Sequence, residues 1–189
     1  GALFGGGWVG LGVIEDLDRG IVDRMLVSPL RRGALVSGLL IPLGIVTAVQ
    51  SLVVVGVGVL RGASLTGGVV GLLGLLLSAM LLAAPFGALS SALAVTIRQQ
   101  ESVVGLTQFL LMPLTFTATA FMPRELLPGW IQGLSRANPV DWSVSAAREG
   151  MMPTPDWGYV VIRLGALLGF TLVAAWIAMA ALRRYQHRA

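Results

Sequence analysis

Long stretches without any charged residue constrain this chain more than any other feature of its sequence. Four such runs, residues 33–60, 62–97, 102–123 and 164–182, are 28, 36, 22 and 19 residues long. A helix needs about 20 apolar residues to cross the hydrocarbon core of a bilayer. Charged residues make up only 12% of the chain, whereas soluble domains carry roughly 25%. The sequence therefore predicts an all-α polytopic membrane protein, with a single transmembrane domain over residues 1–189.

A fifth charge-free run, residues 1–14, is too short to cross a bilayer by itself. The sequence has no initiator Met and opens inside this run, so we expect the end of a span whose beginning lies upstream. The expected spans are this partial one and four full ones over residues 35–60, 69–97, 102–122 and 160–182. Pro85 and Pro113 fall inside two of them, where kinks are expected. The pairs Gly67/Gly71 and Gly165/Gly169 have GxxxG spacing, which favours close helix packing.

The arginines between the spans predict the orientation of the chain. By span parity, the segment 15–32, Arg98 and the tail 183–189 lie on one side and carry eight arginines. The other side carries four, at positions 61, 124, 136 and 148. The positive-inside rule places the first set in the cytoplasm. We therefore expect a cytoplasmic C-terminal tail over residues 183–189.

Residues 15–32, EDLDRGIVDRMLVSPLRR, form a charge-dense segment between two apolar runs. Four arginines and four acids lie in this segment. Each acid has an arginine within a few residues, which favours ion pairs within the segment over a cation site. The apolar residues between them recur at helical spacing. Nothing else in this loop can cover that stripe, which predicts a short amphipathic helix that docks on a partner. The expected contact residues are Leu17, Ile21, Met25 and Leu26.

Residues 123–158, on the opposite side, are too many for a tight turn and too apolar for a free loop. Leu127, Trp130, Ile131 and Leu134 follow the i, i+3, i+4, i+7 pattern of a helix, with Pro128 in its first turn. The Asn138-Pro139 pair ends this helix. We expect Asp141 to cap a second short helix over residues 142–149, which Gly150 ends.

Three of the five tryptophans in the chain, Trp130, Trp142 and Trp157, fall in this region. Indole rings favour the headgroup layer of a membrane. The segment 123–158 is therefore predicted to form interfacial or re-entrant helices at the outer side.

Several kinds of chemistry are excluded by composition. The chain has no Lys, so it cannot contain the lysine of a P-loop that binds ATP. It has no Cys and a single histidine, His187 in the tail, which argues against a metal site and against a Ser-His protease. No acid lies deep in a full predicted span, and the basic residues flank the spans instead of forming one nucleic-acid-binding face. We expect no cofactor, no enzymatic activity and no nucleic-acid partner.

Two motifs resemble those of a known family, the ABC-2 type permeases. An acid, Arg-Gly, a short amphipathic run and Ser-Pro stand between two spans. A Pro-x-x-x-Leu-Pro-x-Trp stretch followed by Asn-Pro, an aromatic residue and an Arg precedes the last span. The chain looks most similar to the drug-exporter permeases of the daunorubicin-resistance type, over essentially its whole length. The matching residues are Glu15, Arg19-Gly20, Met25-Leu26-Val27, Ser28-Pro29, Pro123, Leu127-Pro128, Trp130, Asn138-Pro139, Trp142 and Arg148.

This resemblance implies a six-span subunit of a type V exporter, in a bacterial cell membrane. It also implies a second permease copy or homologue and a separate cytoplasmic ATP-binding cassette subunit that hydrolyses ATP. Segment 15–32 would be the coupling helix on that subunit, through Glu15, Leu17, Arg19, Ile21, Met25, Leu26 and Pro29. Segment 123–158 would form the outer gate, with Pro123, Pro128, Trp130, Asn138, Pro139, Trp142 and Arg148.

The substrate path is expected between subunits, along the partial span and the 102–122 span. Aromatic and hydroxyl side chains in the latter suit an amphipathic drug- or lipid-like substrate, although ordinary helix packing also explains them. Phe109 and Phe116, seven residues apart, are expected as wall residues, and Phe121 nearer the outer gate. Export of a polysaccharide or glycolipid, a membrane scaffold without transport, and an intramembrane enzyme remain alternatives.

Overall fold

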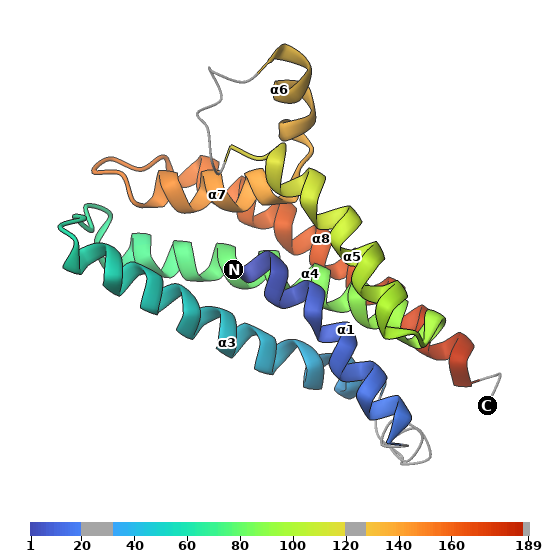
Figure 1. Ribbon diagram of the computed structural model, residues 1–189. Coiled ribbons are helices and arrows are strands. Elements are labelled where there is room, and N and C mark those ends of the chain that lie inside the picture. Colours follow the sequence, from blue (N-terminus) through green and yellow to red (C-terminus); the bar gives the residue numbers. More distant parts are fainter. Residues whose placement is uncertain (20–31, 120–127, 187–189) are drawn as a thin grey trace.

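The computed structural model describes residues 1–19, 32–119 and 128–186 of the chain. These residues form helices and contain no strand (Figure 1). The helices are α1 (Ala2–Asp18), α3 (Arg32–Leu60), α4 (Gly68–Ile97), α5 (Gln100–Phe116), α6 (Gly129–Arg136), α7 (Pro139–Gly150) and α8 (Trp157–Gln186).

Three of these helices are long and apolar enough to cross a membrane. They contain the stretches Ser37–Leu60, Gly68–Ile97 and Trp157–Arg183, with mean hydropathies of 2.3, 2.3 and 2.1. The fourth full span was expected over residues 102–122. The described helix there, α5, has 17 residues and ends at Phe116, so it is about 25 Å long at 1.5 Å per residue. That is shorter than the roughly 30 Å hydrocarbon core of a bilayer.

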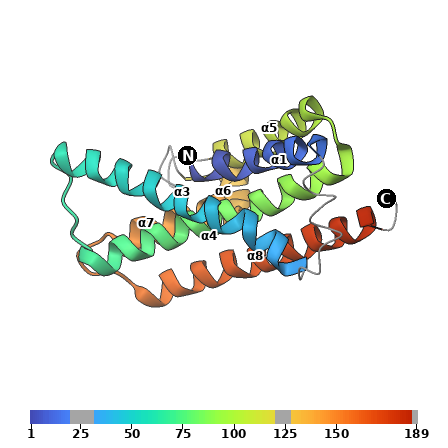
Figure 2. The same cartoon turned by 90° about the horizontal axis from the view of Figure 1, so that it is seen from below.

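Helix α4 is the centre of the bundle, and α1, α3, α7 and α8 pack around it (Figure 2). In its apolar stretch 39% of residues are buried, against 17% in those of α3 and α8. Many of its buried residues are alanine, glycine or serine, which lets neighbouring helices approach closely. The Ser90 hydroxyl shows how close α1 lies, because it donates to the carbonyl of Gly7 and accepts from the N–H of Gly10.

The largest buried cluster joins six segments of the chain. Its members come from α1, α4, α5, the turn after α5, α7 and α8, and they are Leu3, Leu82, Phe86, Leu111, Ala118, Val140 and Leu167. Phe86 also meets Phe170 edge to face, with ring centroids 5.9 Å apart. Because Val140 belongs to this cluster, α7 is part of the core of the bundle.

The ends of the helices fall into two groups. The C-terminal ends of α1 and α8 and the link between α4 and α5 lie at one end of the bundle, and the α3–α4 and α7–α8 links lie at the other (Figure 1). A second cluster ties the first group together, with Val13 and Ile14 of α1 against Val95 of α4 and Val103 of α5. Arg19, Arg98 and Arg183 therefore gather at the same end.

The two GxxxG pairs differ in how closely other parts of the chain approach them. The carbonyl of Gly150, at the end of α7, lies so close to Gly67 and Gly71 that a Cβ on either would overlap it. Close packing at this pair is confirmed. No atom lies within 4 Å of a Cβ built on Gly165 or Gly169. Within the described chain that pair faces open space, so the packing expected there is wrong for this subunit by itself.

Candidate functional site

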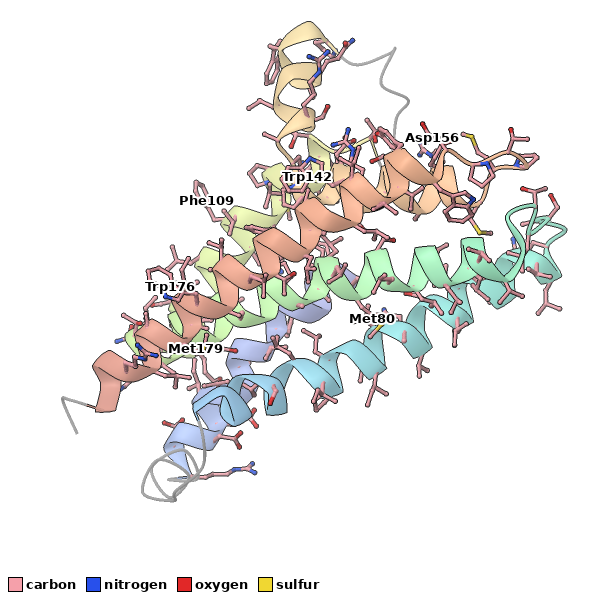
Figure 3. The ribbon with its side chains drawn as sticks, turned by 180° about the vertical axis from the view of Figure 1, so that it is seen from behind. Met80, Phe109, Trp142, Asp156, Trp176 and Met179 are labelled. Atoms are coloured by element: carbon pink, nitrogen blue, oxygen red, sulfur yellow. The ribbon has the colours of Figure 1, made fainter. Side chains whose placement is uncertain are left out.

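Helix α5 buries one face and exposes the other. Val103, Thr107 and Leu111 are buried against the bundle. Phe109 and Phe116 lie on the opposite side, where 79% and 70% of their surfaces are exposed, and Phe109 points away from the other helices (Figure 3). Most of the surface of each ring is therefore left uncovered by the described chain. For Phe109, which is the more exposed of the two, packing within the described chain does not explain the aromatic side chain.

A groove of about 420 Å³ lies between the exposed side of α5 and the junction of α6 with α7. Drug-sized binding sites in proteins have volumes of roughly 300–1,000 Å³. The groove is apolar except at Thr117 and Asn138. Its lining residues are Phe109, Leu110, Pro113, Leu114, Thr117, Leu134, Ala137 and Asn138. It thus brings a predicted pathway residue, Phe109, beside a predicted outer-gate residue, Asn138.

The wall opposite α5 is formed by α6, which stands away from the bundle (Figure 1). Pro128 occupies its N-cap position, and the helix follows at Gly129. Trp130 is 68% exposed on this helix. Trp142, at the start of α7, is tied back to α6, because its indole N–H donates to the carbonyl of Arg136 at 2.6 Å. The placement of both rings at the headgroup level stays a prediction.

Asn138 joins α5 to α7 with both ends of its amide group. Its Oδ1 accepts from the N–H of Val140 at 2.9 Å and caps α7, whose first residue is Pro139. Its Nδ2 donates to the carbonyl of Leu114 at 2.7 Å and to the hydroxyl of Thr117 at 3.1 Å. Asn138 is 3% exposed, so the same buried side chain caps the start of one helix and the end of another.

Asp141 does not cap α7, contrary to the sequence prediction. The helix begins at Pro139, three residues before the expected start at 142, because Asn138 supplies the cap. The Asp141 carboxylate faces the end of α5 instead. There its Oδ1 accepts hydrogen bonds from the backbone N–H of Thr119, at 3.2 Å, and from the Thr119 hydroxyl.

Helix α7 lies along the first half of α4. Val140 packs in the cluster that contains Leu82, halfway along α4, and the Ser143 hydroxyl donates to the carbonyl of Ser78 at 3.0 Å. At its end, Gly150 meets Gly71. The helix therefore runs inward alongside a membrane-spanning helix, an arrangement that favours the re-entrant alternative over one flat on the membrane surface.

The predicted coupling segment is described only at its beginning. Helix α1 continues to Asp18, so Glu15 and Leu17 stand in its last turns, and Glu15 and Arg19 are exposed. Ile21, Met25, Leu26 and Pro29 lie outside the described residues, as do Phe121 and Pro123 of the other predicted sites.

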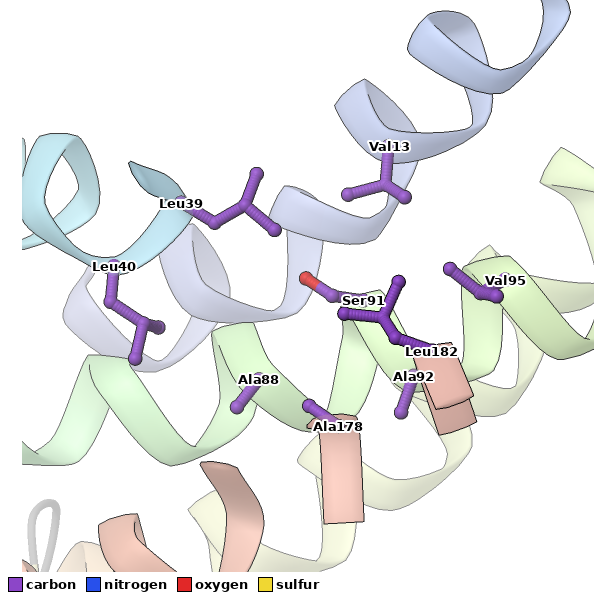
Figure 4. Close-up of a pocket in the computed structure, with 9 residues that line it drawn as sticks. All are labelled: Val13, Leu39, Leu40, Ala88, Ser91, Ala92, Val95, Ala178 and Leu182. Atoms are coloured by element: carbon purple, nitrogen blue, oxygen red, sulfur yellow. The ribbon is translucent and has the colours of Figure 1, made fainter. Parts of the chain in front are cut away.

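Other places in the described chain offer no comparable site. A small cavity of about 20 Å³ between α1, α3, α4 and α8 is almost entirely apolar (Figure 4). Its one hydroxyl, on Ser91, donates to the carbonyl of Gly87 in its own helix. No group of three His, Cys, Asp or Glu side chains that could hold a metal ion occurs in the described residues.

Comparison with known proteins agrees with a helical membrane bundle. The chain belongs to the ABC-2 type transporter family, which matches residues 2–152. It is 28% identical to the daunorubicin resistance ABC transporter permease protein DrrB1 of Streptomyces coeruleorubidus, over 91% of this chain and 61% of that protein. It is 25% identical to the probable doxorubicin resistance ABC transporter permease protein DrrC of Mycobacterium tuberculosis, over 92% of this chain and 63% of that one.

A third relative is the probable multidrug ABC transporter permease YbhR of Escherichia coli, 27% identical over 92% of this chain and 47% of that protein. The chain thus spans less than two thirds of the length of these relatives. No solved structure matches it significantly.

Proposed function

We propose that this chain is the membrane-spanning permease part of an ATP-driven ABC exporter that moves an amphipathic drug- or lipid-like molecule out of a bacterial cell. The observation that carries the proposal is the groove beside α5 in a bundle of the ABC-2 family, with Phe109 on one wall and Asn138 on the other. The names of the relatives, which refer to drug resistance and multidrug transport, support the same substrate class.

The chemistry of the groove fits an amphipathic substrate. Six of its eight lining residues are apolar, and an aromatic ring and several aliphatic side chains can accept an apolar ring system or acyl chain. Thr117 and Asn138 supply a hydroxyl and an amide at one edge. A mostly apolar surface with a few placed polar groups is the usual composition of a small-molecule site.

ATP hydrolysis takes place on a separate cytoplasmic subunit in this proposal, since the chain has no Lys for a P-loop. That subunit docks on segment 15–32. Because α1 continues into the segment without a break as far as Asp18, movement of the docking segment would be passed to α1. From there it would reach α4, against which α1 packs through Ser90.

The complete exporter contains two permeases around a central path, which alternately opens to either side of the membrane. The exposed side of α5, with Phe109 and Phe116, faces the path and the second copy or homologue, and membrane lipid covers the outer surface. Helix α5 belongs to the fourth span. The end of the bundle with Arg19, Arg98 and Arg183 lies in the cytoplasm, together with the C-terminal tail, and segment 123–158 forms the outer gate.

Reconstitution of the full-length protein with its ATP-binding subunit in proteoliposomes tests the proposal. Amphipathic drugs and lipids should stimulate ATP hydrolysis and be transported, whereas polysaccharide precursors should not. Stimulation by glycolipid or polysaccharide alone would replace the proposed substrate class. A protein that binds no ATP-binding subunit, or binds one without any transport, would be a scaffold.

A further inference from the structure

Helix α5 ends halfway along the bundle and not at either end of it, with one side of its last turn buried. Leu111 and Ala118, on either side of the helix end, are buried in the same cluster as Leu82 and Phe86, which lie halfway along α4. A helix end in apolar surroundings needs partners for its last carbonyl groups. The carbonyl of Pro113 accepts from Thr117, and that of Leu114 accepts from Asn138.

Helix α7 begins where α5 ends and covers the rest of α4. The 12 residues of α7 extend about 18 Å, from Val140 beside the middle of α4 to Gly150 beside its first turn. Val103 at the start of α5 packs near the other end of α4. The two helices thus follow one another along a single transmembrane helix, with α6 standing outside between them.

The junction of the two helices holds a buried charge. Asp141 is fully buried, with 0% of its surface exposed, and is the one ionisable side chain among the buried residues of the described chain. Burial of a carboxylate is unfavourable unless hydrogen bonds compensate it. Thr119 supplies two of them, and the first turn of α7 adds the favourable field of a helix N-terminus.

Each polar group of Thr119 makes a hydrogen bond with a side chain of α7. Its N–H and its hydroxyl both donate to Oδ1 of Asp141. Its carbonyl accepts from the guanidinium of Arg148 at 3.2 Å. Asp141 and Arg148 are seven residues apart, about two helical turns, and therefore lie on the same side of α7. One residue of the chain after α5 is therefore bonded to the first turn of α7 and to a turn near its end.

We propose that Asp141 and Thr119 are positioning residues that make α5 and α7 move as one broken span. The inference rests on the proposed function: α5 carries the wall of the path, and α6 and α7 belong to the outer gate. The Thr119 clamp, defined by Thr119, Asp141 and Arg148, then links gate movement to the position of Phe109 and Phe116.

Two variants of Thr119 isolate the hydroxyl. Thr119→Val keeps the shape of the side chain and removes the donor to Asp141, and Thr119→Ser keeps the donor. Ser145→Ala is the matched control on α7, because the Ser145 hydroxyl donates within its own helix, to the carbonyl of Trp142. Asp141→Asn keeps the size of the side chain and one acceptor oxygen, removes the charge and replaces the other oxygen by an NH2 group.

Amide hydrogen exchange of the full-length permease with its ATP-binding subunit measures the clamp directly. In Thr119→Val, exchange at residues 114–119 should be at least about tenfold faster, as expected for loss of a hydrogen bond to a charged group. Asp141→Asn should show a smaller acceleration of about threefold, because neutral hydrogen bonds are about half as strong. Thr119→Ser and Ser145→Ala should resemble the wild-type protein. Equal exchange in Thr119→Val and the wild type, or equal acceleration in Ser145→Ala, overturns the clamp.

ATP-dependent uptake of daunorubicin by inside-out vesicles gives the functional readout. Thr119→Val should hydrolyse ATP at the basal rate but take up several-fold less drug per ATP, and Thr119→Ser should restore the ratio. An unchanged ratio in Thr119→Val would refute the positioning role. If Thr119→Val does not assemble with the ATP-binding subunit, amide exchange and drug uptake per ATP are measured on Asp141→Asn instead. Values equal to those of the wild type would then refute the proposal. Faster exchange in Thr119→Val, together with a wild-type complex that exports no compound, would remove the proposed function and leave the clamp.

Discussion

Replacing Asn138 by aspartate tests whether this residue only caps α7 or also holds the end of α5 through its amide N–H groups. Asp and Asn are about equally good N-cap residues, so a residue that only caps α7 should tolerate Asn138→Asp. In the structure the amide also donates to the carbonyl of Leu114 at 2.7 Å. A carboxylate at this place cannot donate and brings an anionic oxygen against that carbonyl. We therefore expect Asn138→Asp to be at least as destabilising as Asn138→Ala.

The magnitude follows from the bonds that each variant loses. Asn138→Ala removes the cap of α7, worth about 1 kcal/mol, and leaves the partly buried carbonyl of Leu114 without this donor, which costs about 1–3 kcal/mol. The sum is about 2–4 kcal/mol. For a chain of this length that corresponds to a fall in the melting temperature of roughly 5–15 °C.

Thermal unfolding of the purified permease complex, followed by tryptophan fluorescence, measures this difference. Asn138→Ser is the control, since serine caps helices well but is too short to bond Leu114. It should recover the cap contribution and fall between alanine and wild type. A melting temperature of Asn138→Asp within about 2 °C of wild type would refute the shared role of the amide at the ends of α5 and α7.

Three further predictions concern the path, the docking segment and the membrane level. Phe109→Ala should change which amphipathic compounds stimulate ATP hydrolysis while the free energy of unfolding changes by less than about 1 kcal/mol, because the ring is 79% exposed; an unchanged stimulation profile removes it from the path. Joint replacement of Met25 and Leu26 by Asp should abolish co-purification of the ATP-binding subunit, and retained binding with normal transport contradicts the docking prediction. A single Cys at position 130, in a sequence without Cys, should be labelled by an impermeant thiol reagent from outside; labelling from the cytoplasm alone reverses the topology.

The apolar runs predict the long helices well. The spans expected over 35–60, 69–97 and 160–182 correspond to α3, α4 and α8, with ends that differ by at most four residues. Length and hydropathy suffice there because a bilayer requires continuous apolar helices. The seven-residue step between Phe109 and Phe116 predicts that both lie on one face of α5, and both are exposed on the same side of that helix; their role in lining a path stays a prediction.

The junction between α5 and α7 was not predictable in the same way. Asn138 and Asp141 are both good capping residues, and nothing local decides between them. The choice is made by Thr119, 22 residues before Asp141, which takes up the carboxylate. The sequence did indicate that Asp141 has a partner, because an acid in a segment predicted to be re-entrant usually has a specific one. It could be used only once α7 was known to lie beside α4.

The glycine contact between α4 and α7 tolerates few substitutions, whereas the groove tolerates many. Gly67, Gly71 and Gly150 meet backbone to backbone, so the angle between the two helices does not depend on any side chain. The groove walls at Phe109 and Leu134, by contrast, are exposed and can change size without disturbing that angle. If the groove binds substrate as proposed, substrate range can drift by single substitutions there, while a side chain at Gly67 or Gly71 is rejected whatever compound is carried.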